Sequence, residues 1–240
     1  MDIDDILAEL DRSEPTAKAS TALDHQQLTR FWISERAAPD VLKWPTDLMD
    51  RVIARVRQQI ELVEDLTAGA GMTGSGTSSS NSNLTLSILQ TDLSRTQYII
   101  RSLLRQRLAK LTKYAMHYLT LDDKSALLSP QEESFLRNHQ SLLSDLYSAS
   151  FLSAFPAQLQ RLDDNAGGLN MVEGPDGKKA VFIRCLAKRW SSDPLFEDYD
   201  ADDDEEAGES GALAMRRGQV WVVRWEDVKK GVEKGALELL

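Results

Sequence analysis

The stretch SRTQYIIRSLLRQRLAKLTKYAMHYL, residues 94–119, decides the fold class of the N-terminal part of the chain. It lies in a segment from Leu84 to about Leu121 that contains neither proline nor glycine, so the sequence predicts one long helix there. Apolar residues recur along this helix at helical spacing. They form one stripe, which consists of Ile100, Leu104, Leu108, Leu111, Ala115 and Tyr118.

The predicted helix is longer than the domain that would contain it. A helix of about 38 residues is about 57 Å long, whereas a compact domain of about 140 residues has a diameter of about 37 Å. Part of the apolar stripe therefore needs a cover from outside the domain. A helical interface with another protein is the economical explanation, and a long antiparallel hairpin with the preceding helix is the alternative.

The same helix has a basic face. Between residues 95 and 113 it carries no acidic side chain and six basic ones, which are Arg95, Arg101, Arg105, Arg107, Lys110 and Lys113. Such a face suits an acidic protein or DNA. No aromatic residues flank it as a platform for bases, so the sequence favours a protein partner and makes direct DNA binding weak. A helical nucleic-acid-binding protein that uses residues 95–113 is the alternative function.

Other predicted helices surround this one. One ends near Pro39, and the next begins near Pro45 and is followed by a Gly/Ser/Asn tract that predicts a flexible insertion at residues 68–83. On the C-terminal side, the sequence SPQE at residues 129–132 is a capping box with proline at the first helical position, and it starts a further helix. These elements predict a helical bundle domain over residues 21–165.

The pattern changes to strands in the C-terminal part. AVFIRCLA at residues 180–187 alternates apolar and polar positions, and QVWVVRW at residues 219–225 is rich in β-branched and aromatic residues. ALELL at residues 236–240 is predicted to be a final strand. The fold class is therefore α+β, with an N-terminal all-α helical bundle domain and a small β-rich domain over residues 169–240.

Charge is unevenly distributed along the chain. The net charge is −10, and EDYDADDDEEAGE at residues 197–209 holds nine acidic residues and no basic one. A block of like charges is usually solvated, so we predict a disordered acidic loop at residues 191–212. The acidic balance also argues against non-specific DNA binding by the whole chain.

Motifs for catalysis or cofactor binding find no support. The glycines of GAGMTG at residues 69–74 match a dinucleotide fingerprint, but no strand precedes them and no helix-forming sequence follows. The single cysteine, Cys185, and the three histidines lack metal-ligand spacing. The sequence therefore predicts no enzyme, no cofactor and no metal site, and no window is apolar enough to predict a membrane span.

The N-terminal tail carries a short amphipathic segment. In DIDDILAEL the acidic residues Asp4 and Asp5 lead into Ile6, Leu7 and Leu10, which predicts a helix of two or three turns. The tail as a whole covers residues 1–20.

Three groups of residues resemble a known family. The first is W-x-x-E-R-x-A-P, which consists of Trp32, Glu35, Arg36, Ala38 and Pro39. The second lies in the long helix and consists of Tyr98, Ser102, Leu104, Arg105, Arg107, Leu108, Lys110 and Leu111. The third ends the chain and consists of Gly218, Arg224, Trp225, Gly235, Leu237, Leu239 and Leu240. In this order and spacing they resemble the Sld-five subunit family of the GINS complex.

The resemblance implies a nuclear, non-catalytic subunit of a heterotetramer with a helical A domain and a β-rich B domain. Its implied partners are the three other GINS subunits (Psf proteins), the MCM ring and the RecJ-like Cdc protein of the replicative helicase. The tail segment Asp4–Leu10 resembles a peptide that binds the trimeric Ctf adaptor, and through it polymerase alpha. Leu104, Leu108 and Leu111 are expected in the helical core or at the subunit interface, with Arg101, Arg105 and Arg107 in polar contacts around it. Further subunit contacts are expected at Trp32, Glu35, Arg36, Tyr98, Arg224, Leu237, Leu239 and Leu240.

Overall fold

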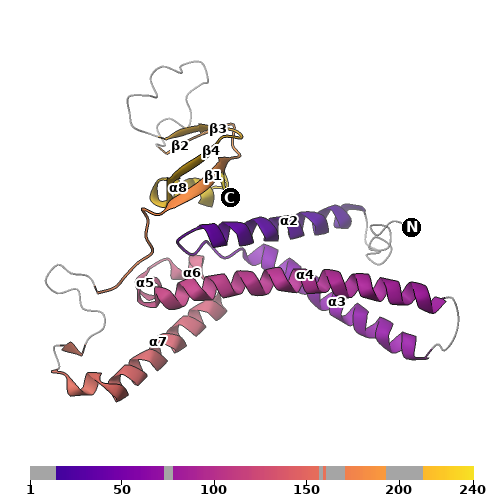
Figure 1. Ribbon diagram of the computed structural model, residues 1–240, viewed down its shortest axis with the longest axis horizontal. Coiled ribbons are helices and arrows are strands. Elements are labelled where there is room, and N and C mark those ends of the chain that lie inside the picture. The colour runs from indigo at the N-terminus through magenta and orange to yellow at the C-terminus, as the bar shows by residue number, and fades with distance from the viewer. Residues whose placement is uncertain (1–14, 73–77, 157–158, 161–170, 193–212) are drawn as a thin grey trace. The chain divides into compact units, whose positions relative to one another are not determined.

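The computed structural model describes residues 15–72, 78–156, 159–160, 171–192 and 213–240 (Figure 1). The chain divides into two compact units. The first unit comprises residues up to Trp32 together with Pro45–Arg105, and the second comprises Ile33–Trp44 together with Gln106–Leu240.

The first unit is built from helices. These are α2 (Pro15–Ala37) as far as Trp32, α3 (Thr46–Met72), and α4 (Ser78–Lys113) as far as Arg105. Its buried apolar side chains are those of Leu28, Leu48, Met49, Val52, Leu89 and Leu103.

Polar contacts connect the three helices of this unit. The buried carboxylate of Asp24 on α2 accepts a hydrogen bond from Arg51 Nη2 on α3 at 2.8 Å. Gln59 Nε2 on α3 donates to Asp92 Oδ2 on α4 at 3.1 Å. The indole of Trp32 donates to Ser102 Oγ at 3.0 Å, which connects α2 to α4.

Helical backbone extends into the range where the sequence predicts a flexible insertion. α3 continues to Met72 and α4 begins at Ser78, so only residues 73–77 lie outside the described part of the chain. Extending an existing helix adds one hydrogen bond for each residue fixed, whereas a glycine in a helix costs only about 1 kcal/mol. Helices on both sides can therefore continue through glycine and serine residues.

The helical part of the second unit contains the rest of α4, the end of α2 and several shorter segments after α4. The shorter segments are α5 (Ala115–Thr120), α6 (Lys124–Leu127), α7 (Pro130–Ser150) and the 3-10 turn η1 (Leu152–Ala154). The sequence predicts one unbroken helix to about residue 121, but the structure interrupts it at Tyr114, where φ is −115° and ψ is 38°. The residues on both sides of the break are buried in one apolar core, so packing overrides the local preference for a continuous helix. This core contains Val41, Leu111, Ala115, Tyr118, Leu128 and Leu136.

The capping box at the start of α7 is confirmed. Ser129 Oγ accepts a hydrogen bond from the backbone N–H of Glu132 at 3.2 Å, and Glu132 Oε2 accepts one from the backbone N–H of Ser129 at 3.0 Å. These bonds satisfy two backbone donors that the first turn of a helix otherwise leaves without partners.

The C-terminal part of the second unit contains the predicted strands. A three-stranded antiparallel sheet has the order β4-β1-β5, formed by β1 (Ala180–Cys185), β4 (Val220–Arg224) and β5 (Leu237–Leu239). Two further short strands that the sequence analysis missed, β2 (Arg189–Ser191) and β3 (Ala214–Arg216), pair with each other. Together with the helical domain this confirms the α+β fold class.

Helix α8 (Trp225–Glu233) covers one face of this region. Val181, Ile183 and Cys185 are buried on alternate positions of β1, and Leu237 and Leu239 are buried on β5. Gly231 on α8 allows the closest approach, because a Cβ atom there would lie 2.6 Å from Trp190 Nε1 on β2.

Two predictions fall outside the described residues. The amphipathic tail segment lies within residues 1–14, and the acidic run at residues 197–209 lies within residues 193–212. The first described helix begins at Pro15, earlier than the predicted start of the helical domain at residue 21. Among the helices that are described, none has the length and apolar character that crossing a lipid bilayer requires.

Candidate subunit interface

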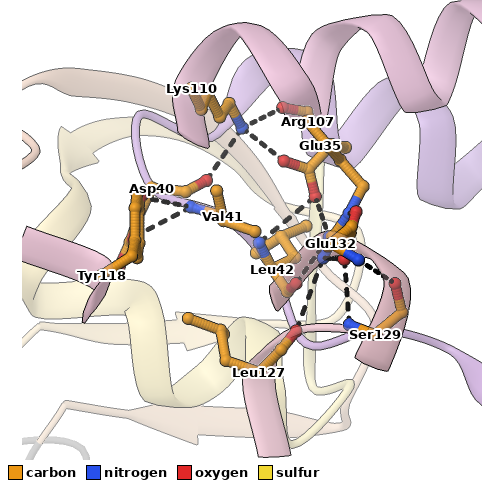
Figure 2. Close-up of polar contacts among 10 residues, drawn as sticks. All are labelled: Glu35, Asp40, Val41, Leu42, Arg107, Lys110, Tyr118, Leu127, Ser129 and Glu132. Atoms are coloured by element: carbon orange, nitrogen blue, oxygen red, sulfur yellow. Dashed lines mark hydrogen bonds and ion pairs between the residues drawn. The ribbon is translucent and has the colours of Figure 1, made fainter. Parts of the chain in front are cut away.

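A buried arginine occupies the centre of the helical part of the second unit. Arg107 on α4 is 0% exposed, and its guanidinium donates to both carboxylate oxygens of Glu132 on α7, at 2.7 and 3.0 Å. It also donates to Glu35 Oε2 at 3.0 Å and to the carbonyl oxygen of Leu42 at 2.7 Å (Figure 2). One side chain thus connects α4, the end of α2, the segment after α2, and the start of α7.

The charges in this cluster balance. Burial works against the charge of Arg107, but the hydrogen bonds and charges of Glu132 and Glu35 outweigh it and raise the pKa of the guanidinium. Its carbon Cζ lies 5.1 Å from the ring centroid of Trp44, a cation–π distance. The side chain that the sequence places on a basic outer face is therefore an internal one.

Lys110 adds a second cation one helical turn further along α4. Its ammonium donates to Glu35 Oε1 at 2.7 Å, to the carbonyl oxygen of Asp40 at 2.8 Å, and to the carbonyl oxygen of Glu35. Burial lowers the pKa of Lys110 below its usual value, although the charge of Glu35 opposes this effect. These bonds hold the end of α2 against α4.

Asp40 and Tyr118 fix the segment that follows α2. The hydroxyl of Tyr118 on α5 donates to Asp40 Oδ1 at 2.7 Å, and the backbone N–H of Val41 donates to the same oxygen at 2.8 Å (Figure 2). Burial and the neighbouring charge of Asp40 raise the pKa of Tyr118 above its usual value, so its proton is retained well above neutral pH.

The carboxylates of Glu35 and Glu132 find all their hydrogen-bond partners within this chain. Glu35 Oε1 accepts from Lys110, and Glu35 Oε2 accepts from Arg107 and from the backbone N–H of Leu42 at 3.2 Å. Both oxygens of Glu132 are occupied by Arg107, and one of them also caps α7 through Ser129. All four carboxylate oxygens therefore have partners within the chain. The cluster stabilises the fold, and it fixes the direction in which α7 begins.

This geometry revises part of the expected interface. Glu35 and Arg107 are 0% exposed and connect the helices of their own chain, so we no longer assign them to contacts with another subunit. Leu111 is equally buried in the apolar core, and Leu237 and Leu239 are buried in the sheet. Of the two places expected for Leu111, the structure shows the helical core, and Leu237 and Leu239 are used by the packing of their own sheet.

The remaining expected contact residues are accessible to different degrees. Trp32, Leu104 and Leu108 are half-buried. Exposed positions are Arg36, Tyr98, Arg101, Arg105, Arg224 and Leu240. The basic face of α4 carries less accessible positive charge than the sequence predicts, because Arg107 is buried and Lys110 is mostly buried. The expected adaptor-binding residues, Asp4 to Leu10, lie outside the described part of the chain.

Sequence reasoning missed an apolar strip on α7. Leu142 is 70% exposed and Leu146 is 59% exposed, while Phe135 is exposed two turns before Leu142. His139 lies between them and stacks on Phe135 with ring centroids 5.8 Å apart. None of the residues 137–151, all of which the structure describes, is buried. The signal was present in the sequence as apolar residues at positions 135, 142 and 146, a spacing that places them on one helix face.

Such a strip has the character of a protein contact surface. Contiguous exposed apolar residues on a helix are typical of interfaces, whereas single exposed leucines need no explanation. We call Phe135, His139, Leu142 and Leu146 the α7 strip. The buried cluster fixes the first turn of α7, so the strip is presented on a helix whose N-terminal end is held at a defined position.

Comparisons with known proteins agree with the motifs. Residues 56–151 match the family described as "GINS complex protein helical bundle domain", and residues 175–240 match "DNA replication complex GINS protein SLD5 C-terminus". A protein of Chaetomium globosum named "DNA replication complex GINS protein SLD5" is 42% identical over 244 residues, which cover 100% of both chains. The chain belongs to the Sld5 family of GINS complex proteins.

Further members of the Sld5 family match along the whole length. The protein of the same name from Debaryomyces hansenii is 34% identical, and the match covers 100% of this chain and 98% of that protein. The one from Eremothecium gossypii is 31% identical, and the match covers 100% of this chain and 99% of that protein. The resemblance found in the sequence is thereby confirmed. The match to the Sld5 helical bundle contains Arg107, Glu132 and the whole α7 strip, so the candidate interface lies within the family's helical domain.

Proposed function

We propose that this chain is a non-catalytic structural subunit of a nuclear GINS heterotetramer, assembled with the three other GINS subunits. Family membership and the names of its relatives support this role in a DNA replication complex. The observation that carries the proposal is the α7 strip, an apolar surface on a helix that the buried cluster orients. In this proposal the strip packs against a helix of a sister subunit.

The strip is large enough to contribute substantially to assembly. Fully burying a leucine or phenylalanine side chain is worth about 1.5–3 kcal/mol, so Leu142 and Leu146 together supply up to about 3–6 kcal/mol. Association itself costs about 4–15 kcal/mol, which these two side chains alone do not offset. The remaining residues of the strip, and further surface on other helices, must therefore contribute to a stable complex.

Co-expression tests the proposed assembly. The full-length chain, carrying an affinity tag, is produced with its three sister subunits, and the double variant Leu142→Glu with Leu146→Glu is compared with the unchanged chain by native mass measurement. We expect the variant to weaken assembly by about 10²- to 10⁴-fold, because two apolar side chains are replaced by charges at the contact.

The matched control is the double variant Leu23→Glu with Leu84→Glu. Both leucines are more than half exposed and lie on α2 and α4, outside the strip. This control should assemble as the unchanged chain does. Stoichiometric complexes from the α7 variant, with helical content retained in its circular dichroism spectrum, would refute the role of the strip.

The wider partners follow from the family resemblance. In the proposed role the tetramer acts with the MCM ring and the RecJ-like Cdc protein as part of the replicative helicase, at initiation and elongation of DNA replication. The tail segment Asp4–Leu10 would bind the trimeric Ctf adaptor as a short amphipathic helix in a groove, and through it reach polymerase alpha. Three aliphatic side chains give weak binding, which a trimeric receptor strengthens through multivalency.

A peptide variant tests the adaptor contact separately. Changing Ile6, Leu7 and Leu10 to alanine should abolish pull-down of the adaptor and leave the tetramer intact, because the proposal assigns these side chains to the adaptor and not to the sister subunits. Unchanged pull-down by the triple variant would contradict the adaptor proposal without affecting the proposed tetramer.

A further inference from the structure

The three-stranded sheet has an apolar row on the face opposite its buried residues. Phe182 on β1 is paired with Val222 on β4, and the backbone N–H of Leu240, which follows β5, donates to the carbonyl oxygen of Phe182 at 3.1 Å. The register therefore places the three side chains side by side across β4, β1 and the end of β5. Their exposed fractions are 58%, 57% and 41%, respectively.

This row departs from the pattern of an antiparallel sheet with one solvated face. Such a sheet places apolar residues toward the core and polar residues toward water. The inward positions follow this rule, since Val181, Ile183 and Leu239 are buried. The outward positions do not, because they carry Phe182 and two valines of β4, all more than half exposed. An apolar outer face of this kind indicates a binding surface.

Positive charge borders the row on both sides. Arg224 is paired with Ala180 next to the row on one side, and Arg184 is paired with Val220 and Glu238 on the other. Arg184 Nη1 lies 3.9 Å from Glu238 Oε2, too far for a hydrogen bond, so this contact leaves the guanidinium able to bind a further anion.

The apolar part of the row favours a protein over a nucleic acid. Binding of single-stranded nucleic acid to a sheet relies on several aromatic side chains on which bases stack. Here only Phe182 of the three row residues is aromatic, and the neighbouring Val220 is aliphatic too. Aliphatic side chains pack instead against the apolar face of a peptide or helix.

We propose that the outer face of the β4-β1-β5 sheet, comprising Phe182, Val222 and Leu240 with Arg184 and Arg224, binds an acidic amphipathic segment of a sister subunit. Apolar side chains of that segment cover the row, and carboxylates that flank them pair with the two arginines. The surface is different from the α7 strip. The inference rests on the proposed function because the segment that binds this face belongs to a subunit of the proposed tetramer.

Photocrosslinking within the assembled tetramer tests the proposal. Phe182 is replaced by p-benzoylphenylalanine in the full chain, and native mass measurement first establishes that the complex has formed. After irradiation we expect crosslinked peptides from a sister subunit in which Asp or Glu residues flank apolar ones. The matched control carries the same replacement at Met171, an exposed apolar residue before β1 and outside the row.

Charge reversal supplies the second measurement. The double variant Arg184→Glu with Arg224→Glu should reduce the occupancy reported by the Phe182 crosslink, and the contact should weaken roughly two- to thirtyfold, as expected for the loss of two exposed ion pairs. Raising the salt concentration should lower the crosslink yield of the unchanged chain in the same direction. The control Lys230→Glu, on α8, should leave the yield unchanged.

Several results would overturn the inference while leaving the tetramer standing. They are a Phe182 crosslink yield no higher than that at Met171, crosslinks confined to this chain, crosslinks to a basic segment, and crosslinks to an added oligonucleotide in preference to protein. Failure of the tetramer to form in the first place would instead refute the proposed function. Circular dichroism of each variant establishes that the sheet has remained folded.

Discussion

Replacing Arg107 by methionine should strongly destabilise the helical part of the second unit. Methionine fills much of the same space but donates no hydrogen bond. Glu35 would keep its bonds from Lys110 and from the backbone N–H of Leu42, whereas Glu132 would keep only the backbone N–H of Ser129. The variant therefore leaves one buried carboxylate without a cation.

The magnitude follows from that unpaired charge. Breaking a buried ion pair by removing one partner costs about 3–5 kcal/mol. The free energy of unfolding of a domain is only about 5–15 kcal/mol, so the folding equilibrium constant should fall between about 10² and 10⁴-fold. Arg105→Met, on the same helix but exposed, should change the free energy of unfolding by less than about 0.5 kcal/mol.

Urea denaturation of the full chain, followed by circular dichroism and by tryptophan fluorescence, measures this loss. Trp44 is a local probe, because its ring lies against the Arg107 guanidinium. Hydrogen exchange within the co-expressed complex gives a second readout: backbone amides in the first turns of α7 should lose protection in Arg107→Met. Adding Glu132→Gln should recover part of the loss, since the carboxylate left unpaired is then neutral.

The reasoning fails if Arg107→Met loses no more stability than Arg105→Met does. It also fails if Glu132→Gln costs the same in the presence and absence of Arg107. That result would mean that the two side chains, although they lie within hydrogen-bond distance, do not stabilise each other.

Two further changes test other parts of the fold. Tyr118→Phe removes the hydroxyl that donates to Asp40, so we expect a loss of about 1–2 kcal/mol in urea denaturation, and a loss indistinguishable from zero would contradict the importance of this bond. Gly231→Ala places a methyl group against Trp190, which should lower stability by about 1–3 kcal/mol and change the near-ultraviolet circular dichroism of the tryptophan; an unchanged melting temperature would show that the indole moves aside.

Local patterns in the sequence were sufficient for the fold class and for most of the elements, but not for the short strands β2 and β3. The capping box at Ser129 and Glu132 marks the start of α7, because it depends only on residues within one helical turn. The alternation in AVFIRC and the β-branched residues of VWVVR likewise predict β1 and β4. The helix ends were less accurate, as at residues 68–83 and at Tyr114, since packing can extend or break a helix against its local preference.

The sequence could not assign the basic residues of α4 to the inside or the outside. Arg105 and Arg107 are two positions apart and chemically identical, yet one is exposed and the other is fully buried. The difference arises from Glu35 and Glu132, which lie 72 and 25 residues away from Arg107 along the chain. No periodicity within a helix contains that information.

The sequence by itself determined the α+β class, the family and the main helices and strands, because each depends on local spacing or on motifs read in order. Only the tertiary structure decided that Arg107 and Glu35 are internal, that the exposed apolar surface lies on α7, and that Phe182, Val222 and Leu240 form one row. The physical reason is that ion pairs and surfaces are made by residues distant in the chain. Their partners are fixed only when the helices and strands have packed.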